Sequence, residues 1–276
     1  MRGGPVMTDQ SATTISSARR GTTVAYGLVA YALFVAVFAY ALGFLANTGV
    51  PKGIDDGPET PAAAAVVINC GLLGLFAAQH SVMARPWFKR RLIRFVPPAA
   101  ERSTYVLAAS LAVALLFWQW RPLPAAIWSF EAGWAVAALW VVKALGVVMV
   151  VGSTIAAGHF KMFGVRQVLS RPSSGRGTAG FRRPRLFWIV RHPIMVGFMI
   201  AFWASPQMSA GRLMFNTLAT GYILVAVRWQ ESDLQAHFGA PYEEYMRDVP
   251  RFLPRLARST RGRPSSPFPA QIGEGQ

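Results

Sequence analysis

Long apolar runs alternate with short basic segments along most of the chain. A helix needs about 20 apolar residues to cross the roughly 30 Å hydrocarbon core of a bilayer. Six runs have or approach that length: 22–46, 62–84, 104–120, 134–157, 193–208 and 212–229. The fifth is the shortest, so it forms either a span or one arm of a hairpin with the sixth. The pattern predicts an all-α fold, a polytopic integral membrane bundle of five to six transmembrane helices with a C-terminal helical hairpin and short cytosolic helices.

The two ends of the chain lack such runs. Residues 1–21 are rich in Ser and Thr, and residues 257–276 consist mainly of polar residues with Pro and Gly. Segments with so little apolar surface to bury stay disordered. We therefore predict a disordered cytosolic N-terminus at 1–21, one membrane domain at 22–256 and a disordered tail at 257–276.

Charge gives the orientation of the bundle. The chain of 276 residues is 53% hydrophobic and only 14% charged, with a net charge of +16. A basic protein can bind nucleic acid, but 24 of the 28 Lys and Arg lie in 1–21, 85–103, 158–192 and the part from 228 onward. The positive-inside tendency makes these segments and both termini cytosolic. We expect a multi-pass membrane protein whose partner is the lipid bilayer, and no nucleic acid.

Four histidines, His80, His159, His192 and His237, lie at the predicted cytosolic ends of the spans. They show no His-x-x-His or His-x-x-x-His spacing and no cluster of carboxylates, so we predict no metal site. Residues 175–180 fit the dinucleotide pattern Gly-x-Gly-x-x-Gly, but no strand precedes them. We interpret this segment as a flexible linker.

Candidate chemistry concentrates in the stretch that begins at Arg191. Pro193 suits the first position of a helix, which leaves His192 at the cap with backbone N–H groups free for an anion. If the last two runs form a hairpin, His192 and Glu231 become neighbours. Gly197 would let a flat ligand lie close to the helix backbone. Anchoring at the membrane interface explains the same residue types equally well.

Two sets of motifs carry a resemblance. The first resembles the isoprenylcysteine carboxyl methyltransferase superfamily of membrane enzymes that use S-adenosylmethionine, and it comprises Arg191-His192-Pro193 with Gly197, then Glu231, then Phe238-Gly239-x-x-Tyr242-x-x-Tyr245 and Val249-Pro-Arg-Phe-Leu-Pro. The second closely resembles the bacterial methanethiol S-methyltransferases, a family grouped with nurim, and comprises residues 74–90, 96–106, 116–122, 159–168 and 219–224. Together they cover about residues 24 to 256.

The resemblance implies methylation of methanethiol to dimethyl sulfide at the cytosolic membrane interface of a bacterial inner membrane. It implies S-adenosyl-L-methionine as methyl donor, a small volatile thiol as substrate and no metal. The cofactor-binding residues that it implies are Arg191, His192, Pro193, Gly197, Glu231 and Tyr242. Met195 and Gln230 stand where relatives often have Tyr and Glu, so a side-chain contact by either residue does not follow from the resemblance.

A thiol with a pKa of about 8.5 is mostly protonated at neutral pH, so the reaction needs a base or an electropositive pocket. Our catalytic candidates are His80, as base or thiol-orienting group, and His159, and the turn at 101–105 is a further candidate for the thiol side. A structural imidazole bonded between helices is the alternative for His80. The alternative functions are methylation of another thiol or of a lipid-borne carboxylate, and a non-enzymatic nurim-like role. The oligomeric state stays open.

Overall fold

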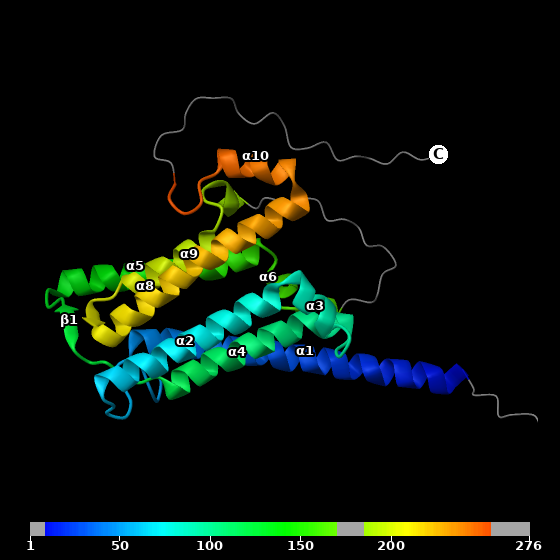
Figure 1. The fold of residues 1–276 in the computed structure, drawn as a ribbon, viewed down its shortest axis with the longest axis horizontal. Helices are drawn as coiled ribbons and strands as arrows, with labels where there is room; N and C mark the ends of the chain where they lie inside the picture. The colour runs from blue at the N-terminus through cyan, green and yellow to red at the C-terminus, as the bar shows by residue number, and fades with distance from the viewer. Residues whose placement is uncertain (1–8, 170–184, 255–276) are drawn as a thin grey trace, which may run out of the picture.

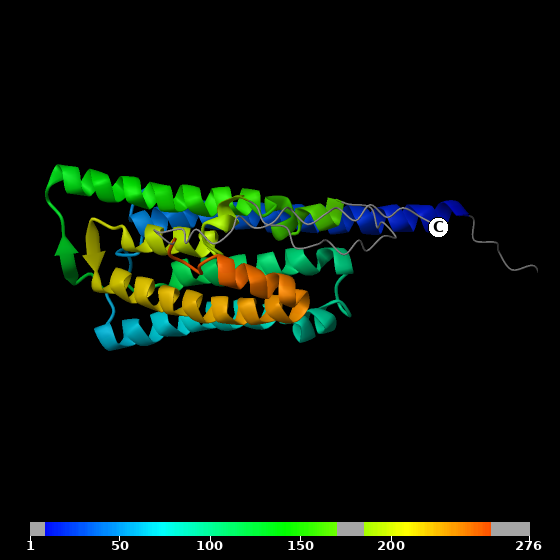
Figure 2. The same cartoon turned by 90° about the horizontal axis from the view of Figure 1, so that it is seen from above.

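The protein is a bundle of long helices that lie side by side (Figures 1 and 2). The computed structural model describes residues 9–169 and 185–254. Among these residues, five helices are long and apolar enough to cross a membrane. They are α1 (Asp9–Ala46), α2 (Ala62–Ala84), α4 (Glu101–Gln119), α5 (Gly133–Ala156) and α9 (Ala210–Phe238). The predicted polytopic helical membrane fold is confirmed.

Shorter helices join and cover the long ones. The fifth predicted run, 193–208, becomes the 11-residue helix α8 (Pro193–Trp203). At 1.5 Å per residue the helix reaches only about 17 Å and cannot cross the hydrocarbon core by itself, so it is a hairpin arm with α9, and residues 204–206 carry the chain on to β2 at the other end of the bundle. The other short elements are α3 (Pro86–Leu92), α6 (His159–Met162), α7 (Val165–Leu169), α10 (Ala240–Asp248) and the 3-10 turns Pro98–Ala100 and Arg185–Trp188.

One small sheet departs from the all-α prediction. The strands β1 (Ala126–Ser129) and β2 (Gln207–Ser209) pair antiparallel, with Trp128 opposite Met208. They lie in the connections before α5 and before α9, at one end of the bundle (Figure 1). Strands of three and four residues are too short for an alternating pattern to indicate them.

Helix boundaries differ from the prediction at two places. The helix α1 already begins at Asp9, so the part of the predicted disordered segment 1–21 that the structure describes is helical. The apolar run ends at 229, but the helix α9 continues through polar turns to Phe238, and Gly239, with a φ of 60°, follows it. Residues 1–8, the Gly motif at 175–180 and the predicted tail 257–276 lie outside the described residues.

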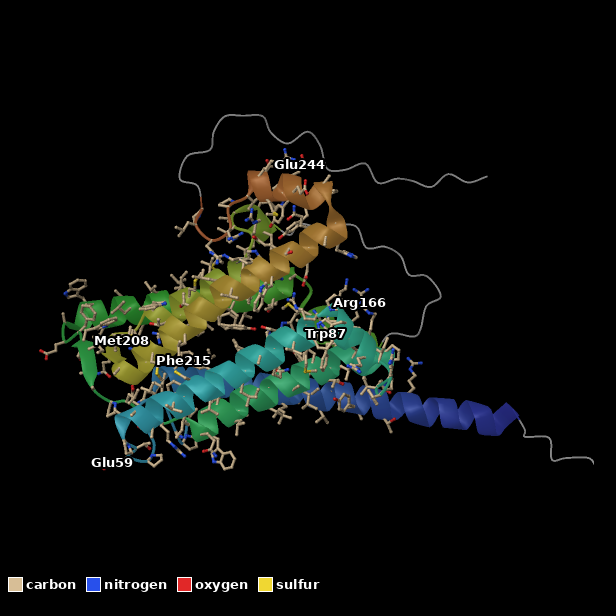
Figure 3. The ribbon with its side chains drawn as sticks, in the orientation of Figure 1. Glu59, Trp87, Arg166, Met208, Phe215 and Glu244 are labelled. Carbon is tan, nitrogen blue, oxygen red and sulfur yellow. The ribbon has the colours of Figure 1, made fainter. Side chains whose placement is uncertain are left out.

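The bundle has two chemically different ends. We call the end that carries Trp87 and Arg166 the basic end, and the end that carries Glu59 and Met208 the opposite end (Figure 3). The helices α2 and α5 finish at the basic end, and α4 and α8 begin there (Figure 1). The segments predicted to be cytosolic therefore gather at one end.

The helices form two layers, and α9 of the second layer contacts α2 of the first. One layer contains α1, α2 and α4, and the other contains α5, α8 and α9 (Figure 1). The helix α4 packs against α1 and α2, and α5 packs along α8. The hydroxyl groups of Tyr222 on α9 and Ser81 on α2 lie 3.0 Å apart and join the layers. At the opposite end, a buried apolar core contains Phe44 of α1, Trp120 at the end of α4 and Phe215 of α9.

A buried polar network also closes the opposite end. The side chain of Arg212, at the start of α9, donates to Asp55 at 2.8 Å and to the backbone oxygen of Leu45 at 2.6 Å. The amide of Asn69 bonds the backbone oxygen and nitrogen of Arg121 at 2.7 and 2.9 Å. Arg212 therefore connects the turn of the α8–α9 hairpin to the end of α1 and the loop that follows it. Asn69 connects α2 to the segment after α4.

Two glycines allow α5 and α8 to touch along their backbones. A Cβ atom at Gly197 would lie 2.7 Å from the oxygen of Gly146 and 2.9 Å from the nitrogen of Val150. A Cβ at Gly146 would lie 2.8 Å from the oxygen of Gly197 and from the nitrogen of Ala201. Contacts this short are with backbone atoms, which side-chain movement cannot relieve, so the position of α8 depends on both glycines.

We predict that Gly146→Ala and Gly197→Ala each destabilise the protein by about 1–3 kcal/mol, because the added methyl group must push the two helices apart. Thermal unfolding of the purified protein in detergent measures the effect. Gly152→Ala on α5 is the matched control, since a Cβ there meets no atom within 4 Å. Equal melting temperatures for the three variants would contradict the proposed backbone contact.

Candidate functional site

The candidate site begins at the start of α8. Pro193 is its first residue and His192 its N-cap, as predicted. The backbone before the helix is paired with the C-terminal segment: the N–H of Arg191 donates to the oxygen of Pro250 at 2.9 Å, and that of His192 to the oxygen of Arg251 at 3.3 Å. This pairing brings the end of the described chain onto the start of α8.

The carboxylate of Glu231 lies at the centre of the site, and its residue is only 2% exposed. One carboxylate oxygen, Oε1, is 2.9 Å from Nε of Arg191 and 2.9 Å from Nε2 of His192. The other oxygen, Oε2, accepts from the guanidinium of Arg251. The predicted proximity of His192 and Glu231, which are far apart in the chain, is confirmed.

The protonation pattern of the cluster follows from these contacts. Between two guanidinium groups the carboxylate of Glu231 is ionised and can only accept hydrogen bonds. Nε2 of His192 therefore carries the proton and donates. Burial lowers the pKa of His192 below its usual value of 6.5, although the contact with Glu231 opposes the shift. The ring is neutral at neutral pH, and its Nδ1 is an acceptor.

The helix α10 covers the cluster. Arg191 donates through its NH1 group to the backbone oxygens of Met246 and Val249 at 2.6 and 3.0 Å. The hydroxyl of Tyr245 donates to the oxygen of Phe187 at 2.7 Å. Tyr242 is 2% exposed, and burial raises the pKa of its hydroxyl to about 12. This cover closes the side of the cluster that faces α10.

Gly197 has a different use from the one predicted. Its open side faces α5, where Gly146 and Val150 fill the space beside the backbone. No room remains there for a flat ligand. The group that approaches the backbone of Gly197 in the structure is the neighbouring helix α5.

His80 lies in a separate aromatic cluster between α2, α4 and α9. Its Nε2 is 2.8 Å from the hydroxyl of Tyr105, and its ring lies 5.2 Å from Phe76 and 6.4 Å from Tyr222, centroid to centroid. Its Nδ1 is buried and has no hydrogen-bond partner among the residues that the structure describes. One ring nitrogen of His80 is therefore buried without a partner in this part of the chain.

The two clusters lie on opposite faces of α9. Tyr222 faces α2, where it contacts Ser81. Asp233 also faces α2, because it forms an ion pair with Arg85 at the end of that helix. Glu231 is nine positions after Tyr222, which is a rotation of about 180° and about 14 Å along the helix axis. The structure does not bring His80 and Glu231 together.

His159 has both ring nitrogens engaged. Its Nε2 is 2.9 Å from the hydroxyl of Tyr31 and its Nδ1 is 3.1 Å from Oγ1 of Thr154. Burial lowers the pKa of this imidazole. The ring lines a largely apolar groove of about 610 Å³ at the basic end, together with Val151, Ile155, Gly158, Phe160, Lys161 and Arg166. Its contacts join α1, α5 and α6, and they leave no free nitrogen for a substrate.

Arg251 is the site residue that sequence reasoning missed. It lies inside the Val249-Pro-Arg-Phe-Leu-Pro motif, which gave it no role. Tyr222, whose ring contacts that of His80, also carried no assignment, whereas Tyr105 belongs to the candidate turn at 101–105. Within 9–169 and 185–254, no group of three or more His, Cys, Asp and Glu is placed to hold a metal ion.

These features define a class, a polytopic helical membrane protein with a buried Arg–His–Glu cluster at one end of its bundle. Residues 69–224 match the model of the family described as NnrU protein. The match includes α2 from Asn69 onward, His192, α8 and the first half of α9, and it ends before Glu231.

Named relatives narrow the class. The chain is 48% identical over 243 residues to methanethiol S-methyltransferase of Mycobacterium tuberculosis, which covers 88% of this chain and 100% of the relative. It is 49% identical over 235 residues to methanethiol S-methyltransferase 2 of Bradyrhizobium diazoefficiens, covering 84% and 89%. Nurim of Bos taurus is 27% identical over 179 residues, covering 62% and 68%. No solved structure matches the chain. The chain belongs to the methanethiol S-methyltransferase family.

We predict that Glu231→Gln destabilises the protein by about 3–5 kcal/mol, because it leaves the buried guanidinium of Arg191 against a neutral amide and removes the charged partner of Arg251. Thermal unfolding in detergent measures the loss. Glu244→Gln on the exposed face of α10 is the control for removal of a carboxylate (Figure 3). If both variants melt at the same temperature as the unmodified protein, the cluster does not hold α8, α9 and the C-terminal segment together.

Proposed function

We propose that the protein transfers a methyl group from S-adenosylmethionine to methanethiol and releases dimethyl sulfide and S-adenosylhomocysteine. The relatives named methanethiol S-methyltransferase support this proposal, since they align along most of the chain. The observation that carries it is the buried cluster of Glu231 with Arg191, His192 and Arg251 at the basic end. It combines a carboxylate with guanidinium groups, which suits a ligand that carries both charges.

The cluster fits the amino-acid end of S-adenosylmethionine, which has an ammonium and a carboxylate group. Glu231 offers a negative charge, and the buried Nε of Arg251 lacks a partner among the described residues. In this proposal Arg191, His192 and Pro193 form the start of α8 on one side of Glu231 and Arg251, and Tyr242 of α10 lies on the other side. When bound, the cofactor supplies a methyl group on a sulfonium centre.

The thiol side of the reaction is proposed at His80. A neutral imidazole with a free nitrogen accepts the thiol proton, which raises the fraction of thiolate. His80 has this free nitrogen at Nδ1, whereas both nitrogens of His159 are engaged. Phe76, Tyr105 and Tyr222 surround the ring with aromatic surface, which suits a small apolar substrate. His159 is assigned to holding α6 against α1.

A membrane interface suits this chemistry. Thiolate and sulfonium carry opposite charges that disappear in the transition state, so a site that excludes water favours the reaction. Methanethiol is small and apolar and enters from the lipid, while the polar cofactor comes from the aqueous side. With the basic end toward the cytosol of a bacterial inner membrane, both termini are cytosolic.

The experiment is an assay of purified protein in lipid nanodiscs with methyl-labelled S-adenosylmethionine and methanethiol. We expect labelled dimethyl sulfide in the headspace, detected by gas chromatography. His192→Ala removes one donor to Glu231 and should reduce the rate, whereas His237→Ala, on an exposed part of α9, should not.

The same assay separates the alternative functions. If the label stays in lipid, or if it is transferred only when a larger thiol is added, the acceptor is not methanethiol but that lipid or thiol. No transfer and no binding of S-adenosylhomocysteine to the folded protein would favour a nurim-like role without catalysis.

We further predict that His80→Gln lowers kcat by about 100-fold or more, the usual loss when a general base is removed, while binding of S-adenosylhomocysteine is unchanged. His159→Gln should lower the melting temperature with a smaller effect on kcat, because its contacts are structural. Steady-state kinetics, calorimetric binding and melting curves on the two variants decide this. A His80→Gln variant with normal kcat would remove His80 from the catalytic machinery.

A further inference from the structure

The two oxygens of the Glu231 carboxylate are held very differently. Oε1 contacts Arg191 and His192, whose side chains are 8% and 7% exposed. Oε2 contacts Arg251, whose side chain is 37% exposed. One half of the carboxylate is therefore fixed within the protein, and the other half faces a cation near the solvent.

Arg191 and Arg251 also differ in how firmly they are bound. Arg191 uses Nε for Glu231 and NH1 for the backbone oxygens of Met246 and Val249. Arg251 is anchored by its backbone, whose oxygen accepts from the N–H of His192. Its guanidinium, with five N–H donors, bonds Glu231, and its buried Nε has no partner within the described part of the chain. Arg251 can turn about its side-chain bonds without disturbing the backbone pairing.

We propose that the guanidinium of Arg251 occupies the place of the cofactor's ammonium group at Glu231, and that Arg251 turns to bind the cofactor's carboxylate when the cofactor enters. This inference rests on the proposed function, because it concerns the amino-acid end of S-adenosylmethionine.

Charge balance supports the exchange. A buried carboxylate that loses its cation is strongly destabilised, so Oε2 of Glu231 needs a positive charge both before and after binding. Arg251 provides it in the unbound protein, and the ammonium group provides it afterwards. The displaced guanidinium then meets the carboxylate of the same ligand, where its planar fork can form two parallel hydrogen bonds. Arg251 is a cofactor-binding residue in addition to those that the family motif implies.

The test compares three ligands that differ only at this end. S-adenosylhomocysteine carries ammonium and carboxylate, its decarboxylated analogue carries ammonium alone, and 5′-methylthioadenosine carries neither. Calorimetry in detergent gives the affinity of each for the unmodified protein, for Arg251→Gln and for the control Arg228→Gln, an exposed arginine on α9.

We expect Arg251→Gln to weaken S-adenosylhomocysteine about 10- to 100-fold, the loss of a charge-assisted pair. The decarboxylated analogue should bind this variant as well as, or better than, the unmodified protein, because Arg251 no longer competes for Glu231. The affinity for methylthioadenosine should change less than about threefold. Arg251→Lys keeps the charge without the fork and should give an intermediate loss with S-adenosylhomocysteine.

Other outcomes overturn the inference. An equal loss for all three ligands would make Arg251 only a structural contact, and melting curves without ligand would show the accompanying loss of stability. Unchanged affinity for S-adenosylhomocysteine in Arg251→Gln would refute any contact with the carboxylate. If the unmodified protein binds the adenosine ligands but forms no dimethyl sulfide, the choice of substrate fails and the inference stands. If the unmodified protein binds none of these ligands, both the proposed function and the inference about Arg251 fail.

Discussion

The buried carboxylate of Glu231 is the interaction on which the basic end of the bundle depends. Its three donors come from the segment before α8 and from the segment after α10, and neither segment is part of a membrane-spanning helix. Burying the carboxylate of Glu231 and the guanidinium of Arg191 costs several kcal/mol per ion unless each is paired, and the partly exposed Arg251 completes the pairing. The start of α8, the half of α9 at the basic end and the C-terminal segment must therefore assemble together or not at all.

The same requirement explains how an 11-residue helix keeps its place. The lipid cannot hold α8 as a span, since it is too short to cross the hydrocarbon core. It is held instead at three levels. The Glu231 cluster fixes its start, the backbone contact of Gly146 with Gly197 fixes its middle, and the Arg212–Asp55 pair fixes the turn into α9. Because all three are short polar or backbone contacts, a shift of α8 by one helical turn, about 5.4 Å, would break each of them.

The sequence predicted the parts of this arrangement that a local pattern encodes. The apolar runs indicated the spans, Pro193 indicated the start of α8, and the hairpin placed His192 beside Glu231. What it could not predict depends on which face of a helix meets which neighbour. Gly197 marks a close approach in any sequence, but only the packed structure decides that α5 and not a ligand approaches. Arg251 went unassigned for the same reason, because its contact with Glu231 joins segments whose pairing has no periodic pattern. The strands β1 and β2 were missed because so short a pair has no signal of its own.

The rotation between Tyr222 and Glu231 limits what Glu231 can do in the proposed reaction. Reacting atoms in a methyl transfer must approach to about 3–3.5 Å. A thiol held by Nδ1 of His80 lies on the α2 side of α9, while Glu231 faces the start of α8. Glu231 therefore acts on the charged end of the donor and not on the thiol or the transferred methyl group. The charge of Glu231 then determines affinity for the cofactor, whereas the environment of His80 determines the rate. The sulfonium of the donor is only three bonds from the carbon that carries its ammonium group, so a donor held at Glu231 reaches a thiol at His80 only when the two faces of α9 are brought together on binding.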